Sequence, residues 1–197
     1  MRIIAATKNA GKIREIEKIF GDLGIEVVSQ QDEGFNVDIE ETGDSFEKNA
    51  MIKARAVSLL SDDIVMADDS GLCIDALDGR PGIYSARYAG ENASDRDKLQ
   101  KVLSEMEPHK NRQAKFVTAV AVILPDGREL VTTGEVKGEI LREPKGENGF
   151  GYDPIFYCDE LQKTFAQATD EEKNQVSHRG RALRKMYENL KEIIKED

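Results

Sequence analysis

Two kinds of hydrophobic pattern alternate along the chain, short apolar runs typical of strands and apolar residues at the spacing of a helix. Short apolar runs predict strands at residues 2–6, 25–29 and 64–67, and two longer strands are predicted at residues 116–124 and 129–141. Apolar residues at helical spacing predict helices at residues 12–23, 44–60 and 94–106, and from 179 onward. Strands that alternate with helices predict an α/β fold in which helices flank a central sheet.

The connections predict a mixed sheet. Pro125-Asp126-Gly127 is a turn sequence between the two longest predicted strands, so these should pair as an antiparallel hairpin. The early strand–helix–strand units favour parallel pairing. Because no repeat or linker interrupts the 197 residues, we expect a single domain over residues 1–197.

The net charge is −10, which argues against a nucleic-acid polymer as partner because such binding relies on basic patches. No apolar run approaches the roughly 20 residues of a membrane helix. The first apolar run is too short for the apolar region of a signal peptide. We therefore expect a cytoplasmic protein that does not bind membranes.

Few side chains other than carboxylates are available for a metal. Cys73 and Cys158 form no CxxC motif, and His109 and His178 are isolated. Any metal ion would therefore be held by carboxylates, which suits magnesium or manganese. Neither GxGxxG nor the Walker motif GxxxxGK[ST] is present, so any phosphate site must have another form.

The apolar run 64–67 leads directly into Asp68-Asp69-Ser70-Gly71. Two carboxylates at the end of a strand could hold a divalent cation or take a proton from water. The alternative is a polar turn that joins two elements. The segment alone does not decide between them.

A second candidate lies between the first strand and the first helix. Its six residues offer backbone N–H groups, a hydroxyl, an amide and two ammonium groups to a phosphate, and they are Thr7, Lys8, Asn9, Ala10, Gly11 and Lys12. A capped turn with solvated lysines is the alternative. Glu40-Glu41 precedes another glycine turn and is either a source of magnesium ligands or a pair of surface acids.

Two later segments could recognise a base. The loop at residues 143–154 contains two aromatic residues, a glycine and a carboxylate, which are Phe150, Gly151, Tyr152 and Asp153. These residues suit stacking and hydrogen bonding to a base, or simple packing. Lys173, Ser177, His178 and Arg179 lie at the entry to the last helix, where Ser177 is a natural N-cap and the cations could contact a ligand.

Taken together, these motifs resemble the inosine/xanthosine triphosphate pyrophosphatases, known as the Ham1 or RdgB family. The matching segments span nearly the whole chain, and their order and spacing are specific. They are Thr7-Lys8-Asn9-Ala10-Gly11-Lys12, Glu40-Glu41-Thr42-Gly43, Phe46 with Asn49-Ala50 and Lys53-Ala54, Ala67-Asp68-Asp69-Ser70-Gly71-Leu72, Pro81-Gly82-Ile83-Tyr84-Ser85-Ala86-Arg87, Gly149-Phe150-Gly151-Tyr152-Asp153-Pro154-Ile155-Phe156 and Ser177-His178-Arg179-Gly180.

The resemblance implies a magnesium-dependent homodimer that splits non-canonical purine triphosphates (ITP, dITP, XTP) into monophosphate and pyrophosphate, and so clears deaminated purines from the nucleotide pool. It makes Asp69 the proton acceptor and a ligand of one Mg²⁺ ion per active site, with Glu41 as second ligand and Glu40 as its alternative.

The remaining roles implied by the resemblance concern the substrate. Residues 7–12 would hold the triphosphate, and Ser70 and Lys173 would also contact it, with Lys53 and Arg87 as further candidates. Residues 150–153 with His178 and Arg179 would enclose the base. Cationic donors there favour the oxygen at position 6 of hypoxanthine or xanthine over the amino group of adenine.

Two other functions are consistent with parts of the sequence. The related Maf pyrophosphatases act on pyrimidine triphosphates, but residues 150–153 and 177–179 fit that group less well. A nucleotide-sensing module without catalysis would not need Asp69 together with a second acid pair.

Overall fold

The structure is a computed structural model that describes residues 2–21 and 24–196. Its strands are β1 (Arg2–Ala5), β2 (Glu26–Ser29), β3 (Ile64–Ile74), β4 (Gln113–Ile123), β5 (Glu129–Ile140), β6 (Phe156–Cys158) and β7 (Lys163–Thr164). Its helices are α1 (Ala10–Phe20), α2 (Phe46–Ser58), α3 (Asp95–Met106), α4 (Asp170–Val176) and α5 (His178–Glu196). Short 3-10 segments lie at Asp75–Leu77, Gly82–Arg87 and Phe165–Gln167.

The strands form one mixed sheet in the order β2-β1-β3-β4-β5-β6-β7, which confirms the predicted α/β class. β1 pairs in parallel with both β2 and β3, so that Ile4 lies opposite Val28 on one side and Val65 on the other. β6 pairs antiparallel with β5 and β7. Among the described residues, no helix is long and apolar enough to cross a membrane.

Several observed elements differ from the predicted ones. The expected strand 64–67 continues as β3 to Ile74, and β6, β7 and α4 were not predicted. These three elements have only three, two and seven residues, too few for a periodic pattern to appear. α1 ends at Phe20, and the last predicted residues of that helix lie outside the described residues.

The chain packs into two compact units. Unit 1 contains the chain up to Asp69, residues 118–134 and the chain from Arg179 onward; unit 2 contains residues 70–117 and 135–178. The boundaries fall within β3, β4 and β5 and after the first residue of α5, so these four elements belong to both units. The expectation of one domain stays a prediction.

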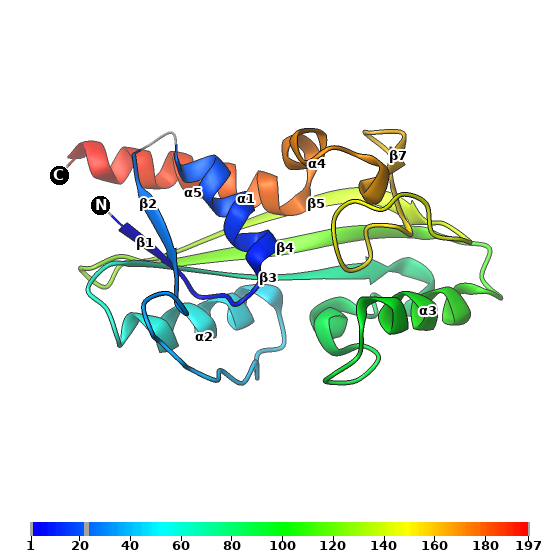
Figure 1. The fold of residues 1–197 in the computed structure, drawn as a ribbon, viewed down its shortest axis with the longest axis horizontal. Coiled ribbons are helices and arrows are strands. Elements are labelled where there is room, and N and C mark those ends of the chain that lie inside the picture. The colour runs from blue at the N-terminus through cyan, green and yellow to red at the C-terminus, as the bar shows by residue number, and fades with distance from the viewer. Residues whose placement is uncertain (1, 22–23, 197) are drawn as a thin grey trace. The chain divides into compact units, whose positions relative to one another are not determined.

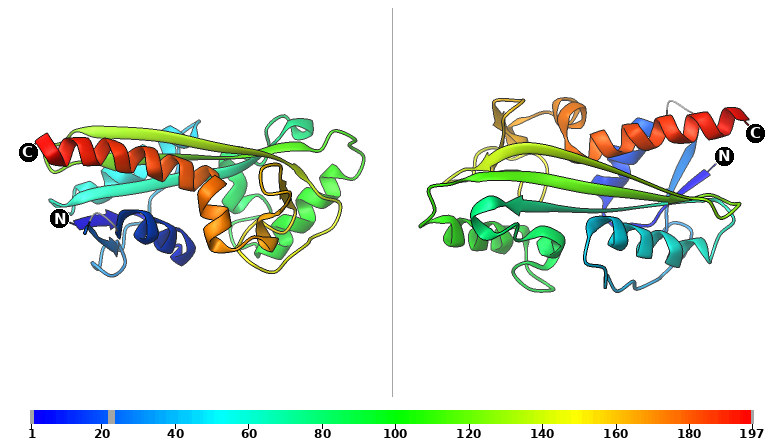
Figure 2. Two further views of the ribbon diagram at one scale, coloured as in Figure 1. Left: turned by 90° about the horizontal axis from the view of Figure 1, so that it is seen from above. Right: turned by 180° about the vertical axis from the view of Figure 1, so that it is seen from behind.

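In unit 1, helices cover both faces of the strands (Figures 1 and 2). Ile3 and Met66 face a core that includes Phe20 of α1 and Leu183 of α5. The neighbouring strand residues Ile4, Val65 and Ala67 point to the opposite face. There they pack against Ala50 and Ala54 of α2. Because alternate strand residues point to opposite faces, both faces of these strands are apolar, as is typical of parallel strands covered on both sides.

Unit 2 has its own core. It combines Leu72 of β3, Met106 of α3 and Ile140 of β5 with an aromatic group. In that group Phe116 contacts Phe156 and Phe165, with ring centroids 4.6 and 5.9 Å apart. Each unit thus buries an apolar core.

Candidate active site

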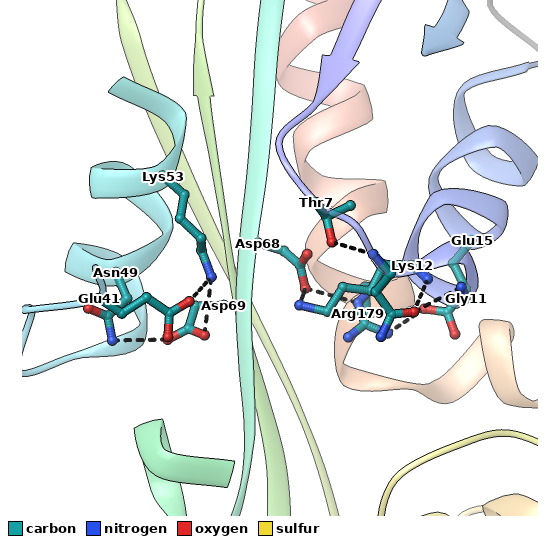
Figure 3. A network of polar contacts seen from close by, with 11 residues as sticks. Thr7, Gly11, Lys12, Glu15, Glu41, Asn49, Lys53, Asp68, Asp69 and Arg179 are labelled. Atoms are coloured by element: carbon teal, nitrogen blue, oxygen red, sulfur yellow. Dashed lines mark hydrogen bonds and ion pairs between the residues drawn. The ribbon is translucent and has the colours of Figure 1, made fainter. Parts of the chain in front are cut away.

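Asp68 and Asp69 lie on opposite faces of β3, because consecutive strand residues point in opposite directions (Figure 3). Both are nearly buried, with 1% and 8% of their side chains exposed. The strand runs straight through them, so the interpretation as a polar turn is wrong. A cation shared by the two carboxylates is likewise ruled out by their divergence, and each acid has separate partners.

Asp69 faces α2 and the loop that precedes it. Its Oδ2 accepts a hydrogen bond from Asn49 Nδ2 at 3.3 Å, and its Oδ1 lies 3.5 Å from Lys53 Nζ. Burial raises the pKa of Asp69 and Glu41 adds to this, while Lys53 opposes it. A carboxylate with a raised pKa and partners on both oxygens is suited to accept a proton at a defined atom.

Glu41 reaches the same group. Its carboxylate contacts Lys53 Nζ, and the Lys53 and Glu41 side chains are 14% and 20% exposed. Burial disfavours the charge on Lys53, but Asp69, Asp68 and Glu41 outweigh it and raise the pKa of Lys53. Glu40 is exposed. Of the two glutamates, the structure therefore brings Glu41 into the Asp69 group.

The donor set suits magnesium that is shared with a substrate. Within the part of the chain that is described, no group of three or more His, Cys, Asp or Glu could hold a metal. Mg²⁺ in phosphate-handling enzymes needs only one or two carboxylates, because water and phosphate oxygens complete its shell. Glu41 and Asp69, which converge on Lys53, satisfy that requirement.

On the other face of β3, Asp68 is the centre of a buried charge network. Its Oδ2 lies 3.0 Å from Lys12 Nζ and 3.1 Å from Arg179 Nε. Arg179 Nη1 also donates to Glu15 Oε2 at 2.7 Å. Burial disfavours the Asp68 carboxylate, but Lys12 and Arg179 outweigh it and hold its pKa far below the ordinary range. The network joins β3 to α1 and α5.

Residues 7–12 form a capped turn at the carboxyl end of β1. Asn9 Oδ1 accepts from the N–H groups of Gly11 and Lys12, at 2.9 and 3.2 Å. Thr7 Oγ1 accepts from the Asn9 N–H at 3.2 Å. Lys8 is exposed and Lys12 is directed toward Asp68. The capped turn is observed, but of its two lysines only Lys8 is solvated, since Lys12 is largely buried against Asp68. The phosphate-binding role of these six residues stays a prediction.

Unit 2 contains the loop at residues 150–153 and Lys173, which were predicted to contact the substrate. Asp153 Oδ2 accepts from Lys173 Nζ at 2.7 Å and from the Phe150 N–H at 2.9 Å. The Lys173 ammonium lies 4.5 Å from the centre of the Phe150 ring. Gly151 has φ +60 and donates its N–H to Asp95. A small loop is therefore organised around one buried ion pair.

Three further candidates occupy different surroundings. Tyr152 is buried and its hydroxyl donates to the Ser85 carbonyl at 2.8 Å. His178 is buried and stacks on Phe116, with centroids 4.7 Å apart. Ser70 is half-buried in β3. Base recognition by Tyr152 and His178 stays a prediction, whereas their packing within unit 2 is observed.

Sequence reasoning assigned no role to Asn49 or Glu15, which contact Asp69 and Arg179. A signal for Asn49 was present, since a polar residue lies beside Ala50 on the inward stripe of α2. A buried asparagine requires hydrogen-bond partners, so its position points to a polar site. Glu15 is one of several acidic residues in its part of the chain, and the sequence contains no comparable signal for it.

Comparison with known proteins finds one family. The model of the Ham1 family matches residues 3–189. A dITP/XTP pyrophosphatase from Bacillus cereus is 47% identical over 195 residues, covering 97% of this chain and 95% of that protein. A dITP/XTP pyrophosphatase from Halalkalibacterium halodurans is 51% identical over 185 residues, covering 93% and 95%.

Solved structures show the same fold. The Ham1 protein of Staphylococcus aureus has a TM-score of 0.87 and 44% sequence identity, with 97% of this chain and 98% of that chain covered. A HAM1 protein from Coxiella burnetii has a TM-score of 0.89 and 43% identity, with 98% and 99% covered. The likeness extends over whole chains.

Proposed function

The chain belongs to the Ham1 family, as its motifs predicted, and on this premise we propose that it is a dITP/XTP pyrophosphatase. It hydrolyses deoxyinosine, inosine and xanthosine triphosphates to the monophosphate and pyrophosphate, and so removes deaminated purines from the nucleotide pool. The single observation that carries the proposal is the convergence of Asp69, Glu41 and Lys53 on one face of β3.

Asp69 is the general base in this proposal. Attack at phosphorus requires that water lose a proton, and a buried carboxylate with a raised pKa accepts one more readily. Lys53 supplies positive charge beside the same carboxylate and offsets negative charge on the phosphates. Asp69 and Glu41 would hold one Mg²⁺ ion, which polarises phosphoryl oxygens when bound.

The proposed substrate contacts are of two kinds, those to the phosphates and those to the base. In unit 1, residues 7–12 bind phosphate through the cations and backbone N–H groups at the start of α1. In unit 2, Phe150 offers an aromatic face and Lys173 and Asp153 offer polar atoms to a purine. His178 and Arg179 favour an oxygen at position 6, while Ser70 serves as a further substrate contact.

We also propose that the protein acts in the cytoplasm as a homodimer, with a nucleoside triphosphate and no nucleic-acid polymer or membrane as partner. The net charge of −10 supports the exclusion of nucleic acid.

The experiment that tests this function is a panel of triphosphates. The protein is incubated with magnesium and inosine, xanthosine, guanosine, adenosine or uridine triphosphate, and monophosphate and pyrophosphate are measured. We expect products from inosine and xanthosine triphosphates above all. Preference for uridine supports a Maf-like enzyme, and binding without products supports a sensor; either result contradicts the proposal.

Replacement of the proposed base gives the sharpest variant in that panel. Asp69→Asn keeps the shape of the side chain but removes its ability to take a proton at neutral pH. We expect pyrophosphate release to fall by at least about 100-fold, with an unchanged circular dichroism spectrum. Release near the wild-type rate would remove Asp69 from the role of base.

A further inference from the structure

Asn49 is a buried amide that contacts both Asp69 and the loop that carries Glu41 (Figure 3). It is 0% exposed and lies in α2, on the stripe that faces the strands. Asparagine is a poor helix former, and burying its amide is costly unless the polar atoms are bonded. Its position on this stripe therefore indicates that its hydrogen bonds are needed.

The backbone N–H of Gly43, in the loop that carries Glu41, determines which way the Asn49 amide points. The Gly43 N–H donates at 2.8 Å to the Asn49 side chain, and a backbone N–H can only donate. The atom that faces Gly43 must therefore be Oδ1. The amide nitrogen is then directed to Asp69, where Nδ2 lies 3.3 Å from Oδ2.

This orientation makes the two oxygens of Asp69 unequal. An NH₂ group is a donor only, so Oδ2 of Asp69 must act as an acceptor toward Asn49. Oδ1 instead lies toward Lys53, which also contacts Glu41. Through one side chain, the loop that carries Glu41 is connected to the orientation of the Asp69 carboxylate.

Glycine at position 43 is part of the same arrangement. A Cβ atom added there would lie 2.6 Å from Asn49 Oδ1 and 2.8 Å from Lys48 Cβ. Its backbone is outside the left-handed region, so the close approach alone accounts for the need for glycine. Adding one methyl group should therefore push the loop and the amide apart.

We propose that Asn49 is a positioning residue for the pyrophosphatase reaction, an inference that rests on the proposed function. It assigns Oδ2 of Asp69 to the amide and Oδ1 to the side of Lys53. Through Gly43, it also holds the loop that carries Glu41 in place relative to that carboxylate. A displacement of about 1 Å at such a group can reduce a rate about 100-fold.

Two variants test this role from opposite sides. Asn49→Leu removes both hydrogen bonds, and Gly43→Ala keeps the amide but displaces its acceptor contact. The controls are Met51→Leu, a buried position of the same helix, and Gly21→Ala, where an added Cβ meets nothing within 4 Å. Thermal unfolding verifies that each variant is folded.

We expect both test variants to lower kcat about 100-fold while KM for xanthosine triphosphate changes less than about threefold, since substrate contacts remain. We also expect Mn²⁺ binding without substrate, measured by electron paramagnetic resonance, to weaken about tenfold. Both controls should match the wild type. If Asn49→Leu fails to fold, the kcat and Mn²⁺ affinity of Gly43→Ala alone test the role of Asn49.

Two results would overturn proposals, and they are distinguishable. Wild-type kcat and Mn²⁺ affinity in the folded test variants would refute the role of Asn49 while the wild-type enzyme remains active. A wild-type protein that releases no pyrophosphate from any purine triphosphate would instead refute the proposed function, and the Mn²⁺ measurements would still report on the geometry.

Discussion

Glu40 and Glu41 are neighbours in the sequence, yet their surroundings differ. Glu41 is partly buried and contacts Lys53, whereas Glu40 is exposed. A charge in bulk solvent is screened within about 10 Å at ordinary salt, while a buried charge acts strongly on its neighbours. The proposed role in metal binding therefore belongs to Glu41.

A matched pair of variants tests that assignment. We expect Glu41→Gln to raise the Mg²⁺ concentration for half-maximal activity about tenfold or more, because a carboxylate of the proposed site is lost. Glu40→Gln should leave it unchanged. A magnesium titration of xanthosine triphosphate hydrolysis measures both. The assignment fails if the two variants behave alike, or if Glu40→Gln has the larger effect.

At the scale of elements, Asp68 connects β3 to α1 through Lys12 and to α5 through Arg179. All three side chains are largely buried, so the loss of one partner leaves charge inside the protein. The exposed pair of Arg55 and Glu129 offers the opposite case, because solvent surrounds it. The buried group of three charges and the exposed pair should therefore differ sharply in their contribution to stability.

We expect Asp68→Asn to lower the free energy of unfolding at pH 7 by about 3–5 kcal/mol, and Glu129→Gln by less than about 1 kcal/mol. The pKa of Asp68 is depressed from its ordinary 3.8 in the folded state, so its stabilisation is complete above that pH and declines below it. Urea unfolding from pH 7 to 3 measures this. The deficit of Asp68→Asn should shrink below about pH 3.8; a deficit independent of pH would contradict the charge explanation.

At the scale of the whole molecule, two of the four unit boundaries fall inside motifs that the resemblance assigns to substrate. One separates Asp69 from Ser70, and the other separates His178 from Arg179. Each unit nevertheless has its own apolar core and its own buried ion pairs. Residues that are neighbours in these two motifs therefore belong to different compact units.

The proposed homodimer gives a prediction at this scale. We expect light scattering after size exclusion to give twice the chain mass of 22.0 kDa, and this value should persist on dilution to micromolar concentration. Increased salt should not dissociate the dimer if apolar contacts dominate its interface. A mass of one chain at all concentrations would refute the proposal.

The sequence by itself determined the elements with a clear period and the family. Strands such as β1 and helices such as α2 have local apolar patterns, and motif order is independent of packing. The tertiary structure alone decided that Asp68 and Asp69 diverge, because the continuation of β3 depends on neighbouring strands and ion pairs. It also decided that Asn49 meets Asp69 and that Arg179 meets Glu15, 20 and 164 residues apart, since such contacts arise from packing and leave no local pattern.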